Sequence, residues 1–130
     1  MSVILVPISP GELLDKITIL RIKSARMTDP AKLENVRHEL VLLEQTWARA
    51  VPTAAQFAAE EHALETVNTR LWDIEDRIRE HEAGHRFDAS FIELARAVYV
   101  TNDERAAIKK RINVALGSKI VEEKSYQPYD

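Results

Sequence analysis

Apolar residues recur every three or four positions along most of the chain, which is the period of an amphipathic helix. We expect four long helices, which begin near Pro10, near Pro30, near residue 54 and at Asp88. The apolar positions form seams spaced three and four residues apart, which is typical of helices packed nearly parallel. The expected seams are Leu13, Leu14, Ile17, Leu20 and Met27; Leu33, Val36, Leu40, Leu43 and Trp47; Phe57, Leu64, Val67, Leu71, Ile74 and Ile78; and Phe91, Leu94, Val98, Ile108, Ile112 and Ala115.

Capping residues mark where the first three helices begin. Ser9 suits the N-cap of the first helix, with Glu12 closing a capping box, and Asp29 suits the N-cap of the second. Thr53 and Gln56 repeat the capping-box pattern, so we expect the third helix to start there and run over roughly residues 54–83.

Three more signals concern the last two helices. Gly84 is expected to end the third helix, and Asp88 to cap the fourth, which runs to Gly117. The sequence TNDE at 101–104 repeats the capping-box pattern inside the fourth helix. We therefore expect a kink or a fresh start near Thr101.

The two ends of the chain have strand character instead. Residues 3–6 (VILV) and 119–121 (KIV) are rich in β-branched side chains, and two such strands can pair. The expected fold is a mainly all-α, up-and-down bundle of four to five helices with long antiparallel hairpins. A short β-ribbon from the two termini completes it, and residues 1–130 form one domain.

Composition excludes several classes of function. The chain has no cysteine among its 130 residues, which excludes disulfides and thiolate metal sites. Its net charge of −3 argues against general nucleic-acid binding, which needs an excess of basic residues. The apolar run at 3–6 is shorter than a signal sequence or a membrane span requires. We expect no membrane span and a cytoplasmic location.

Residues 81–85 read HEAGH, the two-histidine zinc motif of metallopeptidases. His81 and His85 are spaced to share a helical face, Glu82 could act as general base, and Glu104 is a candidate third ligand. The flanking sequences DRIRE and HRFD describe a solvated helix end instead, and a chain of this size leaves little to build a cleft. We expect neither metal nor cofactor, with a zinc hydrolase as the alternative.

A stripe of polar and aromatic residues runs beside the seams of the third and fourth helices. One interpretation is a half-buried polar network that fixes the register of the helices. The other is a ligand site in which two aromatic rings stack on the ligand while an arginine or lysine holds an anionic group. The candidates are Asn68, Trp72, Glu75, Arg79, Tyr99, Asn102, Arg105 and Lys109.

Several segments resemble a family of small bacterial helical proteins classed as a domain of unknown function. The resemblance is carried by SPGELLDKITILRIK, LWDIEDRIRE, FDASFIELARAVYVTNDERAAIKKRIN and VEEKSY, and it spans nearly the whole chain. It implies no activity. Members are often encoded near glycosyltransferase and surface-polysaccharide genes, which suggests a biological context, and HEAGH is not among the matching segments.

A weaker comparison is with all-helical nucleotide pyrophosphohydrolases, which hold magnesium with pairs of acidic residues on bundled helices. Glu12 and Asp15 fit their E-x-x-D spacing, but Glu61 and Glu65 are spaced E-x-x-x-E and come in the reversed order. A magnesium-dependent hydrolase is therefore a second form of the hydrolase alternative.

The leading hypothesis is a non-catalytic binding or assembly protein, with a role in cell-surface polysaccharide synthesis suggested by the resemblance alone. A small anionic-ligand sensor built on the polar stripe is a third hypothesis. Ile19 and Ile22 fall outside the apolar seam of the first helix, which indicates uncovered apolar surface. We therefore expect a homodimer and allow for a further protein partner.

Overall fold

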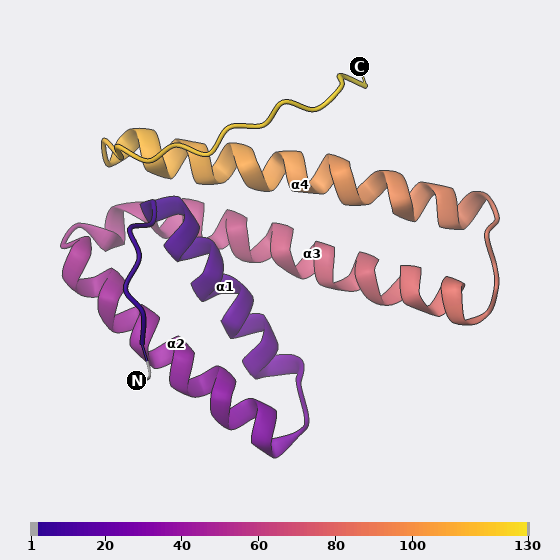
Figure 1. Cartoon of the computed structure of the whole chain (residues 1–130), viewed down its shortest axis with the longest axis horizontal. Coiled ribbons are helices and arrows are strands. Elements are labelled where there is room, and N and C mark those ends of the chain that lie inside the picture. The colour runs from indigo at the N-terminus through magenta and orange to yellow at the C-terminus, as the bar shows by residue number, and fades with distance from the viewer. Residues whose placement is uncertain (1–2, 130) are drawn as a thin grey trace.

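The computed structural model describes residues 3–129. It contains four α-helices, α1 (Pro10–Arg26), α2 (Pro30–Ala50), α3 (Ala58–Ala83) and α4 (Ala89–Ala115), and a short 3₁₀ helix, η1 (Ala54–Phe57). The helices form two hairpins, α1–α2 and α3–α4, and the α3–α4 hairpin extends well past α1 and α2 (Figure 1). The mainly helical fold expected from the sequence is confirmed.

Helix α1 is the centre of the fold, because it packs against α2, α3 and α4. Its sequence explains this position, since buried residues occupy more than one face of the helix. Ile22 is buried although it lies outside the main seam, so it does not add to the uncovered apolar surface that was expected there. The central core contains Leu13, Leu14, Ile17, Trp47, Val51, Phe57, Leu64, Val67, Ile108 and Ile112.

The corner between α2 and α3 is closed by two aromatic rings. Trp47 and Phe57 pack edge to face with ring centroids 6.4 Å apart, and both are buried. Thr53 makes no side-chain capping bond, so the capping box expected there is wrong. The chain instead makes the 3₁₀ turn η1 before α3, because burying Phe57 against Trp47 fixes the path of the backbone at this corner.

Most capping predictions are confirmed. The side chains of Ser9, Asp29 and Asp88 accept backbone N–H bonds at the starts of α1, α2 and α4. Helix α3 ends at Ala83 with Gly84 as its C-cap. Side-chain capping is local chemistry, so it can be predicted from a short stretch of sequence.

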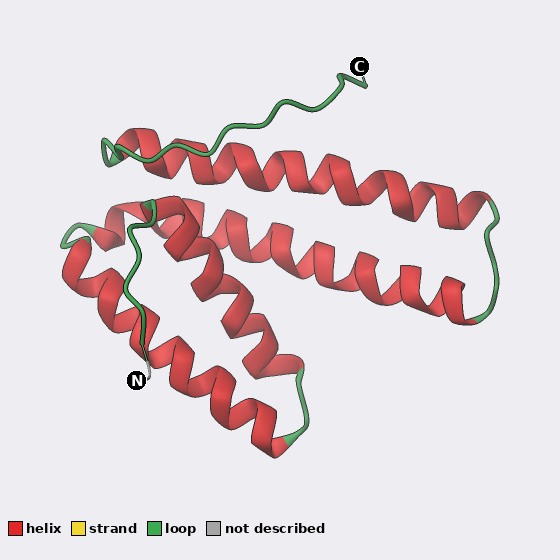
Figure 2. Ribbon diagram, viewed as in Figure 1, coloured by secondary structure: helices red, strands yellow, loops and turns green. Residues whose placement is uncertain are grey.

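Two further expectations are wrong. Residues 3–129 contain no strand, so the β-ribbon is absent there, and residues 3–6 and 119–121 lie in irregular segments (Figure 2). Residues 3–129 form four α-helices, the lower of the two numbers expected. Helix α4 runs unbroken through Thr101, so no fresh start occurs there. Thr101 is only 3% exposed, and its packing against neighbouring helices outweighs the local capping signal.

The segment after α4 turns back along that helix (Figure 1). Gly117 adopts a left-handed conformation with φ of 62°, and the N–H of Ser118 bonds to the carbonyl of Asn113 at 2.8 Å, which closes the helix end. Residues 118–129, which we call the tail, then pass beside α4. This return brings the tail next to the polar residues of α4.

Candidate functional site

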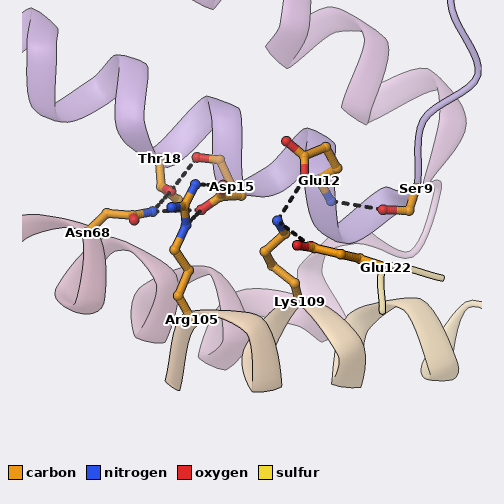
Figure 3. Close-up of polar contacts among 8 residues, drawn as sticks. All are labelled: Ser9, Glu12, Asp15, Thr18, Asn68, Arg105, Lys109 and Glu122. Atoms are coloured by element: carbon orange, nitrogen blue, oxygen red, sulfur yellow. Dashed lines mark hydrogen bonds and ion pairs between the residues drawn. The ribbon is translucent and has the colours of Figure 1, made fainter. Parts of the chain in front are cut away.

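A buried carboxylate on α1 is the centre of the polar structure. Asp15 is fully buried within the bundle, and Arg105 of α4 binds both of its oxygens, with Nε 2.9 Å from Oδ1 (Figure 3). Asn68 of α3 donates to the same carboxylate at 2.9 Å and to the hydroxyl of Thr18 at 3.0 Å. Three helices therefore meet at one hydrogen-bonded cluster, whose groups are satisfied by one another.

A glycine allows α1 and α4 to come this close. The backbone N–H of Gly11 donates to the side-chain oxygen of Asn113 at 2.7 Å. A Cβ atom at Gly11 would lie only 2.5 Å from the carbonyl oxygen of Lys109, so no larger residue fits without a shift. One turn after Gly11 in α1 and one turn before Lys109 in α4, the same close approach brings Asp15 to Arg105.

Lys109 connects α1, α4 and the tail. Its ammonium group lies 2.7 Å from Glu12 and 2.9 Å from Glu122. Burial lowers the pKa of Lys109, but the hydrogen bonds to the two carboxylates outweigh this effect, and the pKa is raised. The hydrogen bond from Lys109 in turn lowers the pKa of Glu122. The tail is thus held to the bundle by an ion pair that is fully charged at neutral pH.

The Asp15 cluster forms one end of an open groove between α1, α3 and α4. The groove has a volume of about 460 Å³. Its apolar lining comes from Ile19, Ile22, Leu71 and Trp72. Its polar lining comes from Asn68, Glu75, Asp76, Arg79, Asn102 and Arg105.

The structure brings together six of the eight ligand-binding candidates, since Asn68, Trp72, Glu75, Arg79, Asn102 and Arg105 all line this groove. Within it, Arg79 donates to Glu75 at 2.7 Å, yet its side chain remains 73% exposed. Arg105 is already held by Asp15. The two arginines therefore differ: one positions helices, and the other faces solvent.

The other two candidates, Tyr99 and Lys109, do not line this groove. The ring of Tyr99 packs against Tyr129 of the tail with centroids 5.1 Å apart. Lys109 belongs to the ion pairs that hold the tail. Both residues meet the tail because it turns back along α4, and no helical periodicity predicts that path.

The residues of the HEAGH motif are not arranged as metal ligands. Helix α3 ends at Ala83, and His85 follows it with φ of 52°, so the two histidines do not share a helical face. The Nδ1 atom of His81 lies 2.9 Å from the carbonyl of Arg77. Glu104 accepts a hydrogen bond from Arg70 at 2.9 Å. Among residues 3–129, no group of three or more histidines and carboxylates is placed to hold a metal ion.

Three of the four carboxylates of the magnesium alternative contact basic side chains instead, and the fourth, Glu65, is exposed. Glu12 contacts Lys109, Asp15 contacts Arg105, and Glu61 contacts Arg21. The positive charge of the basic group beside each of these carboxylates opposes the approach of a metal cation. The polar cluster is therefore organised to join helices.

Sequence reasoning missed Asp15 as the centre of this cluster, and missed Glu122 as the anchor of the tail. The sequence does contain a signal for the position of Asp15. Gly11 lies in the first turn of a helix, where glycine is costly unless another backbone approaches closely. Asp15 follows it by one turn, which places it at the same contact. Glu122 carries no comparable local signal.

Comparison with known proteins supports the resemblance seen in the sequence. A family model described as a family of unknown function (DUF6165) matches residues 4–129. The chain belongs to this family. No curated protein and no solved structure matches it. None of the helices in the described part of this DUF6165 member is long and apolar enough to cross a membrane.

Proposed function

We propose that this DUF6165 protein is a non-catalytic binding protein whose ligand occupies the groove between α1, α3 and α4. The observation that carries the proposal is the convergence of Trp72, Arg79 and Asn102 on one open groove. A concave surface with an aromatic residue and a few converging polar groups is the usual form of a small-ligand site.

The chemistry of the groove favours a neutral ligand rich in hydroxyl groups, of the sugar class. The indole of Trp72 offers a flat apolar surface, while carboxylates, amides and a guanidinium beside it both accept and donate hydrogen bonds. The two acidic residues, Glu75 and Asp76, balance the two arginines in formal charge. The polysaccharide context suggested by the family resemblance is consistent with such a ligand and rests on that resemblance alone.

A small anionic ligand is the second candidate. It is favoured by one observation, the 73% exposure of the Arg79 side chain, whose guanidinium contacts Glu75 through one nitrogen and is otherwise accessible to an anion. The paired state of Arg105 weighs against it, because Arg79 alone then supplies the accessible positive charge. The two candidates are distinguished by the charge of the ligand that binds.

A non-catalytic role agrees with the state of the acidic side chains. Asp15 and Glu12 are held by Arg105 and Lys109, so neither is placed as a free general base. The hydrolase alternative would need a different arrangement of the HEAGH residues, whose two histidines are separated by the end of α3.

Calorimetric titration with neutral monosaccharides (glucose, galactose and N-acetylglucosamine) and with inorganic phosphate tests the proposal. We expect saturable binding of at least one sugar, and about fivefold or greater weakening in Arg79→Ala if one good hydrogen bond is lost. Arg77→Ala is the matched control, because Arg77 is also exposed on α3 but does not line the groove. If phosphate binds and no sugar does, the ligand is an anion instead of a sugar. If Arg79→Ala and Arg77→Ala weaken binding equally, the ligand does not bind in this groove.

We also propose that the protein assembles as a homodimer through the far end of the α3–α4 hairpin. None of residues 75–100 is buried, and Phe87 and Ile92 are 54% and 56% exposed. This part of the hairpin extends beyond α1 and α2, so it lacks a third helix (Figure 1). A second copy packed on the same hairpin would complete a four-helix arrangement around a twofold axis.

Light scattering coupled to size-exclusion chromatography tests the dimer. We expect a dimer for the natural sequence and a monomer for Ile92→Glu, which would place a charge in the interface. Val114→Glu is the control, since Val114 is 69% exposed on the same helix but lies at its other end. A monomeric natural protein, or a dimer unaffected by Ile92→Glu, would contradict this interface.

A further inference from the structure

The tyrosines of the chain gather at one place. The sequence contains three tyrosines, and Tyr99, Tyr126 and Tyr129 all line one pocket between α4 and the tail. The pocket has a volume of about 430 Å³ and is also lined by Asn102, Asp103 and Lys124. It lies outside the central core, so the need to bury apolar surface in the bundle does not explain the clustering.

The rings are exposed, yet two of them are held in place. The centroids of Tyr99 and Tyr129 are 5.1 Å apart with their planes tilted by 55°. The hydroxyl of Tyr129 donates to Asp103 at 2.8 Å. The three residues are 43%, 78% and 58% exposed in sequence order, so the pocket that they line is accessible from solvent. Aromatic faces beside a carboxylate present negative potential to whatever enters the pocket.

The chain itself places a cation in this environment. The ammonium group of Lys124 lies 5.4 Å from the centroid of the Tyr126 ring, within the range of a cation–π contact. An exposed lysine on a flexible stem is a weakly held occupant, because ordering it costs side-chain entropy. A cation with a larger, more weakly hydrated apolar surface would make better use of several rings at once.

From the three rings, the Asp103 carboxylate and the internal Lys124 cation, we propose that this pocket is a binding site for a small organic cation of the quaternary ammonium class. Quaternary ammonium groups are recognised by aromatic cages through the ring faces, and they need no hydrogen-bond acceptor. Lys124 acts as an internal occupant that such a ligand displaces. This site is separate from the Trp72 groove, although Asn102 lines both.

Choline and its uncharged isostere 3,3-dimethylbutan-1-ol test the proposal, because the two differ at one atom in charge but hardly in shape. We expect choline to shift the tyrosine ring resonances saturably in NMR titrations, and the isostere to bind at least about fivefold more weakly. Tyr126→Leu should weaken choline binding by a similar factor. Equal binding of both compounds would show an apolar pocket only and overturn the proposal.

Lys124→Gln tests the role of the internal cation. Removing the competing ammonium group should tighten choline binding several-fold, whereas Lys119→Gln, which changes a tail lysine that does not line the pocket, should leave it unchanged. Both changes are at exposed positions, so neither threatens the fold. If choline binds neither the natural protein nor the Lys124→Gln variant, the proposal is overturned. If choline binds both with the same affinity, Lys124 is not an occupant that choline displaces.

Discussion

Asp15 of α1 and Arg105 of α4 form an ion pair whose carboxylate side chain is 1% exposed, whereas the arginine side chain is 28% exposed. The pair joins two residues that are 90 positions apart in the sequence. Hydrogen bonding to Asp15 raises the pKa of Arg105, against an opposing effect of burial. Since Asn68 of α3 donates to the same carboxylate, this single side chain fixes three helices.

Asp15→Asn should therefore be strongly destabilising. It leaves the guanidinium of Arg105 partly buried without a counter-charge and places an amide opposite the amide of Asn68. We expect a loss of about 2–3 kcal/mol in the free energy of unfolding, measured by urea denaturation. In Arg70→Gln, which breaks an exposed pair with Glu104, the loss should be below about 1 kcal/mol. Equal losses would show that burial of Asp15 carries no special weight.

Gly11→Ala should disrupt the contact between α1 and α4. The added Cβ would lie 2.5 Å from the carbonyl oxygen of Lys109 and 2.9 Å from the side-chain oxygen of Asn113. We expect a loss of about 1–3 kcal/mol in stability by thermal or urea unfolding, as for other overpacked sites. Gly84→Ala is the control, because its φ is −88° and its nearest neighbour would be the flexible side chain of Arg86 at 3.2 Å. A harmless Gly11→Ala would mean that the helices are not this close.

Acid should weaken the attachment of the tail. The hydrogen bond from Lys109 lowers the pKa of Glu122 below its ordinary value of 4.5, so the folded state favours the ionised carboxylate. The resulting stabilisation is present above pH 4.5 and is lost as the pH falls through the lowered pKa. The stability difference between the natural protein and Glu122→Gln should therefore be constant near neutrality and shrink below about pH 4.5.

The size of this effect is small, since the Glu122 side chain is 49% exposed. We expect about 0.5–1 kcal/mol near neutral pH. Glu123→Gln is the control, because it removes the same charge from the residue next to Glu122. It should show neither the loss of stability nor the pH dependence of that loss. Hydrogen exchange of the tail amides provides a second measurement, and faster exchange in Glu122→Gln alone is the expected result.

The histidines of HEAGH should not retain zinc. His85 lies beyond the end of α3, and the ring of His81 packs at 6.3 Å from that of Phe91. After equilibration with zinc and removal of the excess, native mass spectrometry should find no stoichiometric metal, and His81→Ala should change neither the amount of bound metal nor the stability by much. One zinc ion per chain that disappears in His81→Ala would refute this arrangement.

Much of the helical structure can be predicted from local sequence, because caps and apolar periodicity are local properties. Ser9, Asp29 and Asp88 mark the helix starts correctly for this reason. Thr101 shows the limit of this reasoning. Its sequence has the form of a cap, yet the residue is buried in the middle of α4, where contacts with other helices decide the conformation.

The candidate site could be predicted only in part. Helical spacing placed Trp72 and Arg79 on the same face, and the groove brings them together. The role of Asp15 depends on which helices meet, and the positions of Tyr99 and Lys109 depend on the path of the tail. These are long-range contacts, for which the apolar pattern of a single helix contains no information.

The fluorescence of Trp72 provides the most direct test of the proposed ligand groove. The chain has two tryptophans, and Trp47→Phe removes the one buried in the core, so that all remaining tryptophan emission reports on the groove. We predict that a neutral monosaccharide changes this emission saturably, and that the change is weakened in Arg79→Ala but not in Arg77→Ala. Each sugar would be tested up to the concentration at which it begins to change the emission of free tryptophan. If no monosaccharide changes the Trp72 emission in that range, the assignment of this groove as a sugar site is contradicted.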